Sequence, residues 1–171
     1  DFRESALSVV SSKGHNAIEP KYVSHKIYKG TPVLNGLPCV FGEGAETLEI
    51  NSVDEILNVE VTVLYTIFDG IDAVIRSTKI RNLCSEPVKI KKCFSASFDM
   101  DNEDFDMITL HGSWARERHI DRHTVNMGLH QAKSIRGESS HQEHPFLAVL
   151  EHKADWNSGR VYGVNFIYSG N

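Results

Sequence analysis

The sequence is poor in cysteine, with only Cys39, Cys84 and Cys93 in 171 residues. Three widely spaced cysteines without a CxxC pair indicate neither a disulfide framework nor a zinc knuckle, so we expect buried thiols in a reducing compartment. No apolar run approaches the roughly 18 residues of a membrane span, and the first residues do not resemble a secretory leader. We therefore expect a soluble, cytoplasmic protein with no membrane partner.

Positive charge is also scarce. The 18 Lys and Arg residues are outnumbered by 23 Asp and Glu, which gives a net charge of −5 and excludes the basic surface typical of nucleic-acid binding. The length excludes a (β/α)8 barrel, which needs roughly 200 residues or more. A composition of 40% hydrophobic residues is that of an ordinary globular protein, and the length predicts a single domain spanning residues 1–171.

Long amphipathic helices are absent from the pattern, whose period is two. Apolar and polar residues alternate over 58–68 and again over 88–98, which predicts two long, half-buried strands. Shorter strands are predicted at 6–10, 22–28, 47–50, 72–83, 107–110, 146–150 and 160–168. Asp69-Gly70 predicts a hairpin, and Ser52–Leu57 a single helical turn capped by Ser52 or Asp54. About ten strands without crossover helices indicate an all-β, antiparallel sandwich or barrel.

An acidic segment, 99–106, holds five carboxylates and opens like a calcium-binding loop. The sixth and twelfth positions of such a loop require Gly and Glu, but here they are Asp104 and Leu110. We therefore interpret the segment as an acidic loop between two strands.

Seven of the nine histidines lie between His111 and His152. His119 and His123 would share one face of a strand, but four residues of extended chain separate them by about 13 Å, too far for one metal ion. His141 and His144 could share a metal only in a turn. We expect solvated or hydrogen-bonded histidines, with no metal site and no cofactor.

The segment 114–123 is unusual because an extended chain would make both of its faces polar, with Arg116, Arg118 and Arg122 on one side. Such a strand is stabilised by cross-strand ion pairs, or it lies against a polar surface such as a subunit interface or ligand groove. The following turn-rich stretch 136–145 carries donors suited to sugar hydroxyls. Ser140 and His141 are neighbours in sequence, which does not make a catalytic triad, and no G-x-S-x-G motif is present, so we expect no catalytic serine.

Five stretches together resemble the N-terminal region of bacterial α-galactosidases of glycoside hydrolase family 36. They are Asp1–Glu4 (DFRE), Tyr22–Gly30 (YVSHKIYKG), Gly112–Arg118 (GSWARER), Arg136–Gln142 (RGESSHQ) and Tyr162–Asn171 (YGVNFIYSGN), and they occur in the family's order. The resemblance implies a galactose-mutarotase-like β-supersandwich that precedes a catalytic (β/α)8 barrel. The family's two catalytic aspartates lie in that barrel, and its Lys-Trp-Asp type of motif is not found here, so we expect no catalytic residue in this chain.

The resemblance also implies a role in assembly. The family's N-terminal domain helps to build oligomers and approaches the active site of a neighbouring subunit, and the family's chain normally extends beyond both ends of this one, so we expect a truncated sandwich. The expected partners are the protein's own barrel, further copies in a homo-oligomer and a galactoside substrate. The candidate interface or sugar-proximal residues are Trp114, Arg116, Arg118, Arg136, Ser139, Ser140, His141 and Gln142.

Two other functions remain open at this point. An autonomous carbohydrate-binding module would need exposed Trp114, Trp156 and Tyr162 to form a planar stacking platform. A small metal-dependent β-sandwich enzyme would need the histidines to converge on a metal ion.

Overall fold

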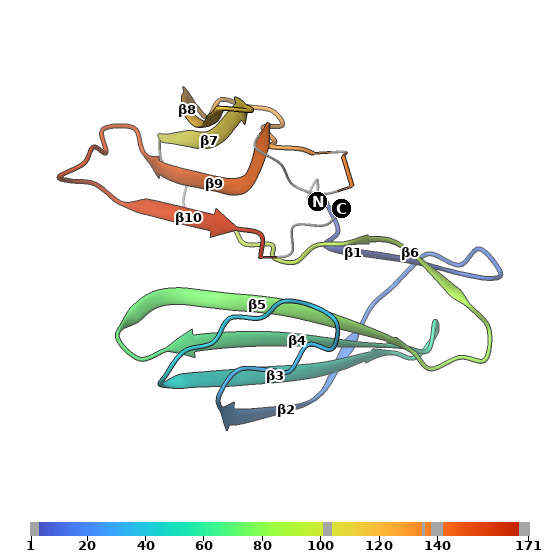
Figure 1. The fold of residues 1–171 in the computed structure, drawn as a ribbon. Helices are drawn as coiled ribbons and strands as arrows, with labels where there is room; N and C mark the ends of the chain where they lie inside the picture. The colour runs from blue at the N-terminus through green and yellow to red at the C-terminus, as the bar shows by residue number, and fades with distance from the viewer. Residues whose placement is uncertain (1–3, 101–103, 135, 138–141, 168–171) are drawn as a thin grey trace. The chain divides into compact units, whose positions relative to one another are not determined.

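The computed structural model describes residues 4–100, 104–134, 136–137 and 142–167, which contain ten antiparallel strands and no helix (Figure 1). The strands are β1 (Leu7–Ser11), β2 (Lys21–Lys29), β3 (Ala45–Asp54), β4 (Val59–Phe68), β5 (Ile71–Asn82), β6 (Val88–Cys93), β7 (Phe105–Ser113), β8 (Arg116–Thr124), β9 (Glu143–Glu151) and β10 (Val161–Asn165). The predicted all-β, antiparallel class is confirmed. Within those ranges, no helix has the length and apolarity needed to cross a membrane.

The chain divides into two compact units, Asp1–Asp99 and Met100–Asn171. The first contains a four-stranded sheet of order β2-β3-β4-β5 and a two-stranded ribbon of β1 and β6, whereas the second contains one four-stranded sheet of order β10-β9-β7-β8 (Figure 1). The single domain predicted for residues 1–171 stays a prediction.

The core of the first unit follows from the alternation in β4. Val59 and Val61 are buried on one sheet face and pack with Val9 of β1 and Leu57. Burial of one such side chain contributes about 2 kcal/mol, so this face fixes the pairing register of β4. The expectation of buried thiols is wrong for Cys93, which is exposed because it ends β6, while Cys39 and Cys84 are half-buried; all three are free.

The connection between β3 and β4 corrects one prediction. Residues 52–54 belong to β3 and do not form a helical turn, because Ser52 pairs with Tyr22 on one side and with Val61 on the other. Strand pairing on both sides therefore overrides the local cap signal. Asp54 still caps the turn that follows: its Oδ1 accepts a hydrogen bond of 2.6 Å from the backbone N–H of Leu57.

Two further boundaries depend on strand partners. The predicted hairpin at Asp69-Gly70 is confirmed, with Gly70 at φ +70° between β4 and β5. In contrast, β6 ends at Cys93 and does not reach residue 98. Its partner β1 begins at Leu7, opposite Cys93, so no strand partner lies beyond this point. The last hydrogen bond of the pair runs from the Phe94 N–H to the Ala6 carbonyl, and Arg76 donates to the carbonyl of Phe94.

In the second unit, β7 and β9 are the central strands, and β8 and β10 form the edges. β7 begins at Phe105, so Asp106 lies in a strand and is buried, which corrects its placement in an acidic loop. The two-residue turn Trp114-Ala115 joins β7 to β8 at one end of the sheet. The connection from β9 to β10 lies at the opposite end, because Glu151 pairs with Phe105.

Candidate functional site

The hairpin between β7 and β8 carries three of the predicted site residues. Trp114 is 76% exposed at its tip, and both Arg116 and Arg118 are exposed on β8. Neither arginine makes a hydrogen bond or ion pair with any part of the chain that the structure describes. Two unpaired guanidinium groups beside an exposed indole are an arrangement suited to contact with a polar or anionic partner.

The backbone of this hairpin is strained at two residues. Ala115 and Arg118 have positive φ angles of 62° and 59°, a conformation that costs roughly 1–3 kcal/mol outside glycine. Arg118 lies in a β-bulge, because the register passes from His111 opposite His119 to Ser113 opposite Arg116, leaving two β8 residues opposite Gly112. The bulge re-aims the side chains next to the tip and, as bulges do on edge strands, discourages further strand pairing.

Gln142, from the second group of predicted site residues, lies at the same end of the sheet. β9 begins at Glu143, which lies directly opposite His111, so Gln142 precedes β9 at the end where the hairpin tip lies. Arg136 is exposed and, within the described ranges, makes no hydrogen bond or ion pair. Ser139, Ser140 and His141 lie outside the described residues. We call Trp114, Arg116, Arg118 and Gln142 the tip surface.

His111 links three strands beneath this surface, and nothing in the neighbouring sequence indicates this role. Its Nδ1 lies 3.0 Å from Glu143 Oε2 on β9, its Nε2 lies 2.7 Å from Thr109 Oγ1, and the same Nε2 is 3.9 Å from Asp121 Oδ2 on β8. The order hydroxyl, imidazole, carboxylate resembles a catalytic triad. Thr109 is only 3% exposed and lies within a strand, so its hydroxyl is not placed to attack a substrate. The contacts therefore serve structure.

The rest of β8 also carries polar side chains, and some of them contact one another. Asp121 Oδ2 lies 3.6 Å from His123 Nδ1, and the His123 ring stacks on His130 with centroids 5.5 Å apart. Across the described ranges, no three histidine, cysteine or carboxylate side chains converge to hold a metal ion. On this strand His123 therefore contacts a carboxylate and a second imidazole.

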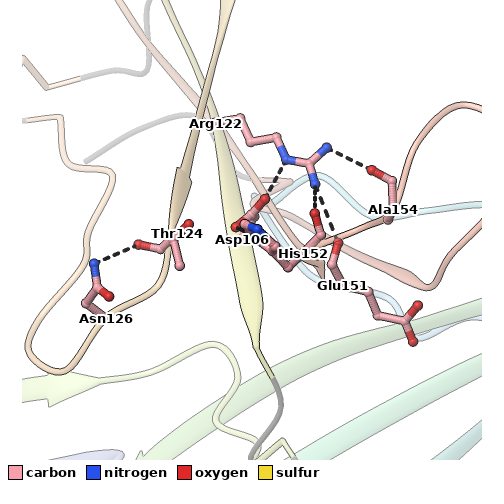
Figure 2. Close-up of polar contacts among 7 residues, drawn as sticks. All are labelled: Asp106, Arg122, Thr124, Asn126, Glu151, His152 and Ala154. Carbon is pink, nitrogen blue, oxygen red and sulfur yellow. Dashed lines mark hydrogen bonds and ion pairs between the residues drawn. The ribbon is translucent and has the colours of Figure 1, made fainter.

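At the opposite end of the sheet, Arg122, Asp106 and His152 form a cluster of polar contacts that we call the clamp (Figure 2). The guanidinium group of Arg122 contacts Asp106 Oδ2 at 2.7 Å through Nε and donates at 2.8 Å to the carbonyls of Ala154 and His152. His152 Nδ1 lies 2.8 Å from the other carboxylate oxygen of Asp106. Arg122 is thus fully engaged, unlike Arg116 and Arg118. The partners are 16 to 46 residues apart in sequence, so no local spacing could reveal them.

The clamp changes the acidity of Asp106. The hydrogen bond with His152 is the largest cause that lowers its pKa, with further hydrogen bonds from Arg122 and Thr124. Burial acts in the opposite direction, but the pKa still falls to about 2. Asp106 is therefore held ionised at neutral pH, which suits a structural carboxylate and not a proton donor.

The three aromatic residues of a carbohydrate platform do not come together. Trp114 lies at the hairpin end, whereas Trp156 lies in the β9–β10 connection at the other end, and Tyr162 is near it, opposite Val149. Strand β7, nine residues long, spans roughly 30 Å between these ends. The stacking platform that the carbohydrate-binding module requires is therefore not formed by these residues.

Comparison with known proteins identifies the family. Residues 1–171 match the glycosyl hydrolase family 36 N-terminal domain. The chain belongs to this family. Among curated relatives, the family 36 chain is 42% identical over 174 residues to alpha-galactosidase AgaA of Geobacillus stearothermophilus and 40% identical to alpha-galactosidase 1 of Pediococcus pentosaceus. Each alignment covers 100% of this chain but 24% of the relative.

Solved structures of family 36 enzymes share the fold. The crystal structure of AgaA superimposes with a TM-score of 0.94 at 42% identity, covering 99% of this chain and 24% of that one. A variant of AgaA has also been solved in complex with raffinose, with the same TM-score. The antiparallel β-sandwich of the family 36 N-terminal domain is thereby confirmed, and the chain spans about a quarter of the length of these relatives.

Proposed function

We propose that this chain is the non-catalytic N-terminal domain of a longer α-galactosidase that hydrolyses terminal α-galactosides of the melibiose or raffinose type. The observation that carries the proposal is the match of the whole chain to one quarter of enzymes named α-galactosidases, one of them a raffinose complex. The three free cysteines support a cytoplasmic location for the protein.

The carboxylates of the chain support a non-catalytic role. A retaining glycosidase needs two carboxyl groups about 5 Å apart on either side of the scissile bond. The two buried aspartates of the described residues are each occupied by structural hydrogen bonds: Asp54 binds the backbone N–H groups of Glu19 and Leu57, and Asp106 binds Arg122 and His152. Neither is available to protonate or attack a glycoside.

We further propose that the tip surface contacts the catalytic barrel or a neighbouring subunit near a galactoside-binding site. It is supported by the exposure of Trp114, by the two unpaired guanidinium groups and by the positive φ of Arg118, since strain of this kind persists where a surface is used. Desolvated Trp and Arg side chains are also the residue types that dominate interface energetics.

One experiment tests both halves of the proposal. The 171-residue chain and the full-length protein are assayed with p-nitrophenyl α-galactoside, and the chain alone is expected to be inactive. In the full-length protein, R116A/R118A should weaken assembly or raise the galactoside KM. R81A is the matched control, because Arg81 is exposed on β5 and makes no hydrogen bond or ion pair with described residues. Hydrolysis by the chain alone would refute the first half, and unchanged assembly and KM in R116A/R118A would refute the second.

A further inference from the structure

We propose that His111 is a positioning residue that holds the β7–β8 hairpin and the start of β9 in the register that the tip surface requires. The inference rests on the proposed function of the tip surface and adds a residue that positions it. Its basis is one imidazole that contacts side chains of all three strands on which the tip surface is built.

The position of His111 places it under both halves of the tip surface. It is two residues before the end of β7, directly opposite His119 on β8 and Glu143 on β9. Glu143 immediately follows Gln142, so the imidazole–carboxylate contact fixes the point at which Gln142 enters the sheet. A change at His111 is therefore transmitted to the hairpin tip through β7 and to Gln142 through β9.

The hydrogen bonds of His111 depend on its charge. In a neutral imidazole one ring nitrogen donates, so Nδ1–H binds Glu143 while Nε2 accepts from the Thr109 hydroxyl. In the imidazolium both nitrogens donate, and the contact with Glu143 becomes a charge-assisted hydrogen bond. The tautomer follows from the partners that each nitrogen has.

His111 is the side chain that links Glu143 to the other two strands. Glu143 faces it from β9, Asp121 and His119 face it from β8, and its own strand supplies the hydroxyl of Thr109. The second carboxylate oxygen of Glu143, Oε1, is buried without a hydrogen-bond partner, so among the described residues the side chain of Glu143 is held by His111. Loss of the imidazole therefore leaves the start of β9 without this contact.

The proposal is tested in the full-length protein with H111Q and, as a matched control, H119Q. His119 lies directly opposite His111 and is exposed, but it makes no hydrogen bond or ion pair with described residues. We expect H111Q to raise the galactoside KM or the dissociation constant of assembly roughly threefold or more, with kcat unchanged. H119Q should match the wild type.

A second variant, E143Q, removes the charge but keeps an acceptor for the His111 N–H. It should keep the KM and assembly of the wild type, whereas E143A, which removes the acceptor, should raise the KM or the dissociation constant of assembly as H111Q does. This pair keeps the proposal testable if H111Q does not fold. A lower melting temperature of H111Q with unchanged KM and assembly would show a merely structural role and overturn the inference. If R116A/R118A is also without effect, the proposed function itself fails; if R116A/R118A is impaired and H111Q is not, only the role of His111 fails.

Discussion

Replacement of Asp106 by Asn should destabilise the second unit in a pH-dependent way. The pKa of Asp106 falls from 3.8 to about 2 in the folded chain, chiefly through the hydrogen bond with His152 and also through Arg122. A difference of nearly two pKa units corresponds to about 2.5 kcal/mol of stability at neutral pH, at 1.36 kcal/mol per unit. Because the folded pKa is depressed, this stability is present above pH ~4 and is lost as the pH falls through about 2.

The assay is urea unfolding of the wild type and D106N, followed by far-UV circular dichroism and the fluorescence of Trp114 and Trp156, both in the second unit. The free-energy difference between the two proteins should be about 2–3 kcal/mol at pH 7 and should shrink towards pH 2.5. D72N is the control, because Asp72 is exposed on β5 and lacks a hydrogen bond or ion pair with described residues. A difference that is absent at pH 7, or identical at pH 7 and pH 2.5, would refute the assignment of the clamp.

Three further substitutions test local geometry by thermal unfolding. R118G should stabilise the chain by roughly 0.5–1 kcal/mol, because glycine adopts a positive φ without strain. R116G, at a residue without a positive φ, should not stabilise the chain. Equal losses of stability in both variants would contradict the strain at Arg118. G159A should cost about 2 kcal/mol or more, because its Cβ would lie 2.5 Å from that of Ala154 at φ +101°, whereas G70A meets open space and should cost about half as much. T47V should cost about 1–3 kcal/mol, since the buried hydroxyl of Thr47 donates to the Gly30 carbonyl at 2.7 Å; a neutral result would mean that water replaces it.

The sequence predicts those strands whose own pattern of apolar and polar residues reflects their environment. The alternation over 58–68 reproduces β4 to within one residue, because its period of two is visible locally. Burial nevertheless changes face along the strand, from Val59 and Val61 on one face to Leu64, Thr66 and Phe68 on the other. The polar character of both faces of 114–123 likewise predicts an exposed strand, and β8 is an exposed edge. Where the pattern within one strand determines its structure, the prediction agrees with the fold.

Predictions from the sequence fail where a residue distant in sequence determines the local structure. The cap signal at Ser52 is genuine, but pairing with β2 and β4 keeps that residue extended. The four acidic residues that precede Asp106 predict a loop there, but Asp106 is buried in β7, where Arg122 and His152, far away in sequence, bind its carboxylate. The sequence around His111 does not distinguish it from the other histidines, because its contact with Glu143 depends on the register of β7 and β9.

The two ends of the second sheet differ in how their arginine side chains are bound. At one end the guanidinium group of Arg122 binds one carboxylate and backbone carbonyls, and these contacts hold β7, β8 and the β9–β10 connection together. At the other end Arg116 and Arg118 are unpaired among the described residues, and one of them is held in a strained backbone conformation. A chain under selection for stability alone would place glycine at that bulge and pair those charges. The tip surface is therefore the part of this unit for which we propose a partner.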